Sequence, residues 1–187
     1  MSKPAILDVT GIGNAIVDII ARTDDAFLAR HAIAKGGMTL IDAAAANQLY
    51  GAMGPGIEKS GGSAANTIAG VAALGGRAAF IGKVQQDQLG EVFAHDLRAM
   101  GVRYDTPAST SENPTGRCLI LVTPDAQRSL STFLGRGRNC GLRTSIRQSS
   151  RRRRSLIWKA ICGTRPMPRR RFARPWKSPM APDARLP

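Results

Sequence analysis

The sequence has few of the features that mark secreted, membrane or disulfide-bonded proteins. Its three cysteines, Cys118, Cys140 and Cys162, are far apart, with no C-x-x-C pair and no neighbouring His. Neither a zinc site nor a disulfide framework is therefore indicated. No apolar stretch approaches the roughly 18 residues that a membrane span requires, and no apolar segment typical of a signal peptide follows the first residues. This pattern predicts a cytoplasmic protein that does not contact a membrane.

Aromatic residues are also scarce, at 5% of the chain, whereas hydrophobic residues make up 43%. A hydrophobic share near that of average globular proteins excludes a wholly disordered chain. Because so few rings are available, we expect a core built mainly from Ala, Val, Ile and Leu, and we expect Cys118 to be a buried thiol within it.

Acidic residues are nearly absent from one end of the chain. Residues 1–134 carry 11 Lys and Arg against 12 Asp and Glu, whereas residues 135–187 carry 16 against one, Asp183. The net charge of +14 thus comes from the last 53 residues, which also contain six of the eleven prolines. We expect two parts: a folded domain at 1–134 and an irregular, basic tail at 135–187.

The pattern of the first part alternates between strands and helices. Two short apolar stretches within residues 6–22, separated by glycines and Asn14, predict a strand, a tight turn and a second strand. The further expected elements are, in order, a helix after Asp24 and Asp25, a strand at 36–41, a helix at 42–53, a helix from Ser63, a strand at 77–84 and a helix at 90–101. Such alternation predicts βαβ units and a mostly parallel sheet.

A pair of glycines, Gly61 and Gly62, stands directly before the helix that starts near Ser63. Backbone N–H groups without neighbouring Cβ atoms can approach a bound hydroxyl or anion at the positive end of a helix dipole. Asn66, one turn further on, carries an amide that can donate to and accept from vicinal hydroxyls. The spacing alone is equally compatible with an ordinary turn, a helix-capping Ser63 and a solvated Asn66. Neither a Walker A motif nor a kinase glycine loop is present.

Beyond these local patterns, the chain contains a long segment, GGSAANTIAGVAALGGRAAFIGKVQQDQLGEVF, that resembles the first signature of the ribokinase (PfkB) family of carbohydrate and nucleoside kinases. The segments GIGNAIVDI, GGMTLI and TGRCLILVTPDAQRSLSTFLG resemble other parts of the family in the same order, so that the resemblance covers about residues 4–135. GNAIVDI and GGSAANTI are most similar to the adenosine-kinase branch. The resemblance implies a ribokinase-like three-layer α/β sandwich with a mostly parallel sheet and a small β lid.

The resemblance also implies a substrate site and an activity. Asn14 and Asp18 would bind the hydroxyls of a sugar or nucleoside, and a carboxylate can accept from two vicinal hydroxyls at once. A second group of substrate contacts would comprise Gly61, Gly62, Ser63 and Asn66. Arg128 matches an arginine that approaches the transferred phosphate, although it is equally compatible with an exposed strand-edge arginine. The family transfers phosphate from ATP with Mg²⁺ to an alcohol group, adenosine being the acceptor we prefer, and a homodimer is possible for the parent enzyme.

The sequence after Leu134 departs from the family. We find no G-A-G-D motif, whose aspartate activates the acceptor hydroxyl in the family, no N-x-x-E motif and no adenine-binding segment. The expected chain is therefore an inactive fragment, without a catalytic residue, metal ligands or the segments that bind ATP and Mg²⁺.

Three interpretations of residues 135–187 remain open. The tail can be solvated and disordered, or it can be an Arg-rich nucleic-acid-binding arm with Trp158, Phe172 and Trp176 available to stack on bases. The third interpretation is a shifted reading frame. One choice of codons for residues 161–187, read from the third base, gives LWDPPDAKEAFREAMEIAHGAGRKVA, which contains an amphipathic helix. We favour the frameshift, with disorder and only non-specific nucleic-acid binding as its consequences.

Overall fold

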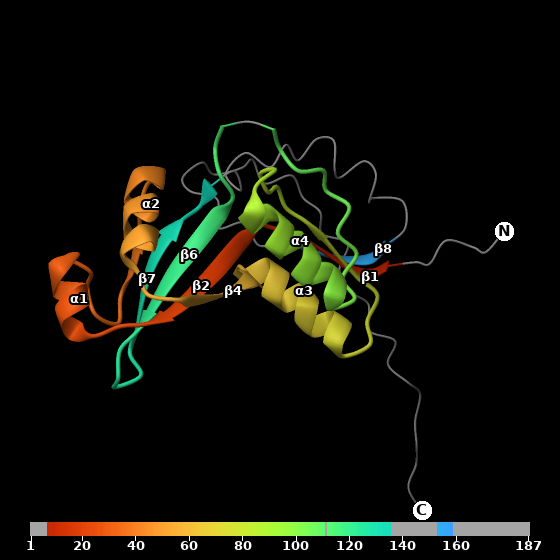
Figure 1. The fold of residues 1–187 in the computed structure, drawn as a ribbon. Helices are drawn as coiled ribbons and strands as arrows, with labels where there is room; N and C mark the ends of the chain where they lie inside the picture. The colour runs from red at the N-terminus through yellow and green to blue at the C-terminus, as the bar shows by residue number, and fades with distance from the viewer. Residues whose placement is uncertain (1–6, 111, 136–152, 159–187) are drawn as a thin grey trace, which may run out of the picture.

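A computed structural model describes residues 7–110, 112–135 and, for the backbone, 153–158 (Figure 1). The elements in chain order are β1 (Leu7–Ile12), β2 (Ile16–Arg22), α1 (Asp25–Arg30), β3 (Met38–Leu40), α2 (Ala43–Ala52), β4 (Gly56–Gly61), α3 (Ser63–Ala73), β5 (Ala78–Ile81), α4 (Gln88–Ala99), β6 (Gly116–Val122), β7 (Arg128–Phe133) and β8 (Arg153–Trp158). The predicted alternation of strands and helices is confirmed.

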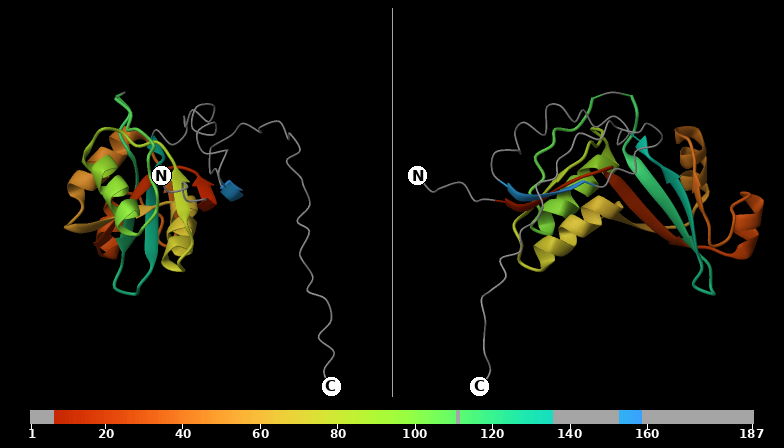
Figure 2. Two further views of the ribbon diagram at one scale, coloured as in Figure 1. Left: turned by 90° about the vertical axis from the view of Figure 1, so that its right-hand side faces the viewer. Right: turned by 180° about the vertical axis from the view of Figure 1, so that it is seen from behind.

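The strands form two sheets. The first contains three parallel strands in the order β5-β1-β8, and α3 and α4 lie over one of its faces (Figures 1 and 2). The second, which we call the lid sheet, contains five strands in the order β3-β7-β6-β2-β4. Its β2 runs parallel to β6 and antiparallel to β4, and β7 runs antiparallel to β6. The expected parallel sheet and small β lid are both present.

Aspartates begin three of the helices. The carboxylates of Asp24, Asp42 and Asp87 accept hydrogen bonds from backbone N–H groups three residues later, at 2.7, 2.8 and 2.8 Å. Such N-caps stabilise a helix by about 1 kcal/mol each, because they satisfy amides that have no partner within the helix. The predicted starts of α1 and α2 are thereby confirmed.

One hydrophobic core joins the two sheets and α3 and α4. It is built largely from aliphatic residues, as expected, among them Ile68, which is fully buried. Three rings also meet in it: Phe93 lies 5.7 Å from Phe80 and 5.5 Å from Tyr104 between ring centroids. The Tyr104 hydroxyl donates to the carbonyl of Gly82 at 2.9 Å, which satisfies the buried polar atom.

Two strands, β4 and β8, lack the alternating pattern that is typical of a strand. β4 contains glycines and charged residues, and it forms because its backbone pairs with the apolar strand β2. The expectation that the whole tail is irregular is wrong for residues 153–158, because β8 pairs in parallel with the open edge of β1. Backbone pairing needs only N–H and C=O groups, so a sequence can join a sheet edge without a strand-like pattern.

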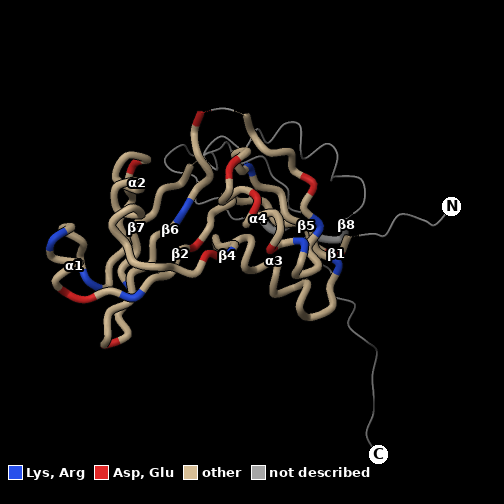
Figure 3. The backbone as a smooth tube through the Cα atoms, in the orientation of Figure 1, with Lys and Arg blue, Asp and Glu red and all other residues tan. Residues whose placement is uncertain are grey.

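Charge is spread over the described part of the chain. Lys and Arg alternate there with Asp and Glu, and neither sign fills one side (Figure 3). The remainder of the basic tail lies outside the described residues, as do Cys140, Cys162, Phe172 and Trp176. No helix in the described ranges is long and apolar enough to cross a membrane.

Candidate functional site

Several predicted substrate contacts lie where the two sheets meet. The chain leaves the first sheet at Ile12 and enters the lid sheet at Ile16, so that Asn14, which is 8% exposed, belongs to the link between them. Gly61 ends the lid strand β4 and is paired with Ile16. Gly62 then leads into α3, which packs against the first sheet. The structure thus brings the first-turn residues and the glycine pair together.

The carboxylate of Asp18 occupies the space above Gly61. A Cβ atom on Gly61 would lie 2.3 Å from Cγ and Oδ2 of Asp18 and 2.4 Å from Oδ1, far inside an ordinary contact. Only glycine leaves this carboxylate where it is. Burial raises the pKa of Asp18 above its ordinary value of 3.8, because the ionised form loses hydration.

Gly62 has a backbone conformation that other residues rarely adopt, with φ +92° and ψ 133°. A Cβ atom there would lie 3.0 Å from the carbonyl oxygen of Asn14, so the turn also requires the close approach of two backbones. Gly62 is the N-cap of α3, and no side chain caps this helix. The first backbone N–H groups of α3 therefore lie where the two sheets meet, without the Asp cap that the other three helices have.

The remaining predicted site residues have different positions. Ser63 is the first residue of α3 rather than its cap, and its carbonyl accepts from the Thr67 hydroxyl at 2.7 Å. The helix-capping Ser63 that the spacing allowed is thus not present. Asn66 is exposed in the first turn of α3, and its backbone N–H donates to the carbonyl of Gly62 at 2.9 Å.

Arg128 lies outside this cluster. It is exposed at the start of β7 and is paired with Val122, whereas Asp18 is paired with Cys118. These two partners lie four residues apart on β6, so Arg128 and Asp18 are about 13 Å apart along the sheet at the rise of a β-strand. Arg128 lines an open hollow of about 550 Å³ at that end of the lid sheet, together with Ile120 and Leu130.

An apolar surface adjoins Asp18 on the lid sheet. Direct cross-strand partners share a face of a sheet, so Asp18 lies on the same face as Cys118 and Thr132. The further apolar residues of this surface, which we call the lid face, are Ile20, Met38, Leu40, Ile57, Ile120 and Leu130. Met38, Leu40 and Ile57 are more than half exposed. Large exposed apolar side chains gathered on one face mark a surface that binds another molecule.

Cys118 is the buried thiol that the sequence indicated, at 6% exposure. Burial raises the pKa of its thiol, and the Thr132 hydroxyl donates to Sγ at 3.2 Å. Cys118 is therefore held as a neutral, apolar neighbour of Asp18 rather than as a nucleophile.

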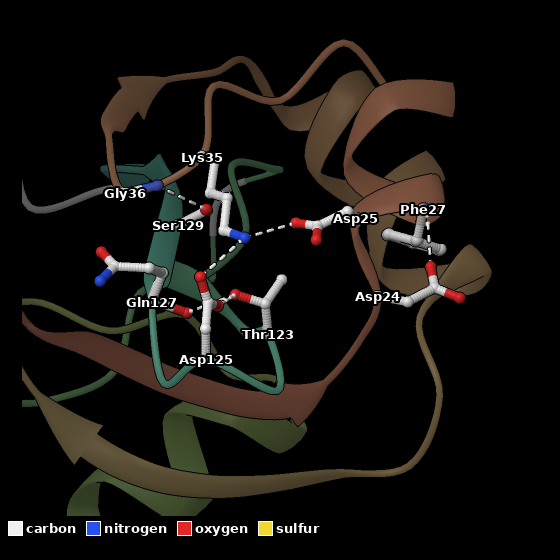
Figure 4. A network of polar contacts seen from close by, with 9 residues as sticks. All are labelled: Asp24, Asp25, Phe27, Lys35, Gly36, Thr123, Asp125, Gln127 and Ser129. Atoms are coloured by element: carbon white, nitrogen blue, oxygen red, sulfur yellow. Dashed lines mark hydrogen bonds and ion pairs between the residues drawn. The ribbon is translucent and has the colours of Figure 1, made fainter.

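A polar network fixes β3, the outermost strand of the lid face (Figure 4). The Lys35 ammonium lies 2.7 Å from Asp25 and 2.9 Å from Asp125, and so links α1 to the turn between β6 and β7. The N–H of Gly36 donates to the Ser129 hydroxyl at 3.0 Å. Hydrogen bonds from Lys35 and Thr123 lower the pKa of Asp125 to about 2.

Two residues near the site were not identified from the sequence. Asp96 on α4 accepts a hydrogen bond from the N–H of Ser60, at 2.8 Å. Arg117 is 7% exposed within β6; its guanidinium donates to Asn47 and lies 5.7 Å from the centre of the Tyr50 ring. Burial lowers the pKa of Arg117. The alternation in GRCLILV places Arg117 on the face of Leu119 and Leu121, which signals its burial.

The described residues contain no group of three or more His, Cys, Asp or Glu side chains that could hold a metal ion.

Comparison with protein-family models shows the class. The model of the pfkB family of carbohydrate kinases matches residues 34–143, and the chain belongs to this family. The predicted resemblance and the ribokinase-like fold are confirmed.

The most informative structural matches are kinases. Adenosine kinase from Sinorhizobium meliloti is 51% identical, with a TM-score of 0.74; the match covers 82% of this chain and 47% of that one. A probable sugar kinase from Rhizobium etli CFN 42 is 46% identical, with a TM-score of 0.73, and 83% and 47% are covered. Anopheles gambiae adenosine kinase, at 24% identity and a TM-score of 0.70 over 80% and 47%, shares the fold. The chain spans about half the length of these kinases. A search of curated proteins gave no match.

Proposed function

We propose that the described residues form the acceptor-binding part of an ATP-dependent kinase of sugars or nucleosides, with adenosine as the preferred acceptor. The observation that carries this proposal is the placement of the Asp18 carboxylate over Gly61 at the junction that contains Asn14. An ionised carboxylate accepts hydrogen bonds from two hydroxyls, and the Asn14 amide and the uncapped amides of α3 supply donors nearby. This combination suits the vicinal hydroxyls of a ribose.

The lid face favours a nucleoside over a free sugar. A sugar has hydroxyls around its ring and gains little from apolar contacts, whereas a purine presents a flat surface that is stabilised by them. The apolar residues of the lid face start beside Asp18 and extend to Met38 and Leu40 on β3. The similarity to a solved adenosine kinase supports adenine as the base.

We further propose that this chain does not catalyse phosphoryl transfer by itself. The family uses ATP with Mg²⁺, and the chain has no G-A-G-D segment to activate the acceptor hydroxyl. The contribution of its own residues is to bind and orient the acceptor.

Titration calorimetry with adenosine and with ribose tests the binding proposal. We expect adenosine to bind more tightly than ribose, and we expect the Asp18→Asn variant to lose most of the affinity for both. Equal weak binding of both ligands by both proteins would refute the assigned site. An assay with labelled ATP tests the second proposal, and turnover of adenosine at about 1 s⁻¹ or more would contradict it.

For residues 135–187 we propose a shifted reading frame. The support is compositional: 14 of the 16 basic residues of this part are Arg, and a family-like peptide can be obtained from another frame. Sequencing of the gene tests the proposal. A single-base insertion or deletion near codon 135 must restore a G-A-G-D motif downstream; if none does, the proposal is wrong.

A further inference from the structure

Helix α4 lies along the open edge of the lid sheet. β4 is the last strand in the order β3-β7-β6-β2-β4, so one of its sides pairs with β2 and the other faces α4. The N–H of Ser60 points to the α4 side, where it donates to Oδ2 of Asp96 at 2.8 Å in a partly buried position. A hydrogen bond to an ionised acceptor is stronger than one between neutral groups. Asp96 therefore ties the strand edge to the helix.

The helix that carries Asp96 is itself anchored. The carboxylate of Asp87 caps it through the N–H of Gly90 at 2.8 Å, and also accepts from the N–H of Thr115 at 2.9 Å and from its hydroxyl at 2.6 Å. Phe93 and Leu97 of α4 are fully buried in the core. Asp96 thus extends from a fixed support.

The amide held by Asp96 immediately precedes the glycine pair. Gly61 follows Ser60 and approaches the Asp18 carboxylate so closely that no Cβ atom fits between them. Glycines have no side chains that could anchor the turn, so the position of Gly61 and Gly62 depends on the backbone that flanks them. If Ser60 moved, Gly61 would move with it, and the contact between Gly61 and the Asp18 carboxylate would change.

We propose that Asp96 is a positioning residue, which fixes the Gly61–Gly62 turn against Asp18 and thereby sets the affinity for the acceptor's hydroxyls. The expected effect of Asp96 on acceptor binding rests on the proposed function. Its expected effect on the Gly61–Gly62 turn rests on the geometry alone. Asp96 acts through the backbone and does not touch the acceptor.

The test compares three variants of the full chain. Asp96→Ala removes the acceptor of the Ser60 hydrogen bond, whereas Asp96→Asn keeps a weaker one. Glu91→Gln makes the same change of charge at an exposed position on α4 and serves as the control. The measurements are the amide hydrogen exchange of Ser60, the carbon chemical shift of the Asp18 carboxyl group during a pH titration, and the affinity for adenosine.

In Asp96→Ala we expect Ser60 to exchange at least about tenfold faster, the titration of Asp18 to shift, and adenosine to bind about tenfold more weakly. Asp96→Asn, which keeps a weaker acceptor, should lie between Asp96→Ala and the wild-type chain in each property, and Glu91→Gln should match the wild-type chain. If Asp96→Ala does not fold, an intermediate exchange rate of Ser60 in Asp96→Asn supports the role, and a wild-type rate overturns it.

Unchanged exchange of Ser60 in a folded Asp96→Ala would overturn the proposal, and so would faster exchange with unchanged titration of Asp18 and unchanged affinity. A wild-type chain that does not bind adenosine would refute the proposed function instead. The exchange of Ser60 and the titration of Asp18 would then still decide whether Asp96 positions the turn.

Discussion

Replacement of Gly61 by alanine should weaken acceptor binding strongly while leaving the fold intact. The new Cβ atom would lie 2.3 Å from the Asp18 carboxyl group, whereas ordinary van der Waals contact begins at 3.4 Å, so the carboxylate must move by roughly 1 Å. We expect a displacement of this size in a group that positions the acceptor to weaken acceptor binding by about 100-fold, or about 2.7 kcal/mol. Gly61 is a strand residue without positive φ, so its backbone accepts alanine, and overpacking should cost about 1–3 kcal/mol of stability.

Titration calorimetry with adenosine and urea unfolding measure the two effects of Gly61→Ala separately. Gly51→Ala is the matched control, because this helical glycine of α2 has no atom within 4 Å of the new Cβ. The control should bind adenosine as the wild type does and gain about 0.5–1 kcal/mol of stability, since alanine favours a helix. If Gly61→Ala binds adenosine within twofold of the wild type, the contact between Asp18 and Gly61 does not determine the site.

Four other changes have expected outcomes. As pH rises through the elevated pKa of Asp18, adenosine affinity should rise, and the free energy of unfolding should fall because the folded state holds the proton more tightly. Asp18→Asn should remove both effects, the first measured by calorimetry and the second by urea titration. Persistence of either pH effect in the variant would contradict the assignment to Asp18. In Lys35→Gln the pKa of Asp125 should rise from about 2 toward its ordinary 3.8 in an NMR titration, and the stability that this carboxylate contributes above pH 3.8 should be smaller; an unchanged pKa would show that Lys35 is not the cause. Phe93→Ala should cost about 3–5 kcal/mol in urea unfolding, because the ring is fully buried, and a cost below about 1 kcal/mol would exclude tight packing there. Deletion of residues 159–187, which carry eight Lys and Arg and one Asp, should weaken binding to any polynucleotide and flatten its salt dependence in filter-binding assays, whereas preference for one sequence would indicate a selected function.

The sequence predicted those elements whose local signals agree with the tertiary structure. The helix starts at Asp24 and Asp42 were visible because the capping carboxylate stands directly before an apolar pattern. β4 and β8 were not visible, because each forms by pairing with a strand that is distant in the sequence. Such pairing depends on which edges the fold leaves open, and no local pattern records it.

The candidate site follows the same division. Gly61 and Gly62 could be picked out because close backbone approach requires glycine at fixed positions, whereas Asn14 and Asp18 were indicated by the family resemblance alone. Asp96 could not be found in this way, because its carboxylate meets Ser60, 36 residues away, only after α4 has docked on the lid edge. The spacing allowed Ser63 as a cap, yet the helix begins one residue earlier than a serine cap would require.

The short link between the sheets makes affinity and shape depend on each other. Asn14 lies in residues 13–15, which join β1 to β2, and Asp18 lies beyond that link on the lid sheet. A molecule held by both residues spans the joint and restrains the angle between the two sheets. A molecule held by Asp18 and the lid face alone adds no restraint on that angle beyond the one that the shared core supplies. Ligands of equal affinity can therefore differ in how much they stiffen the protein, and a bridging ligand should protect the amides of residues 13–15 from exchange where a non-bridging one does not.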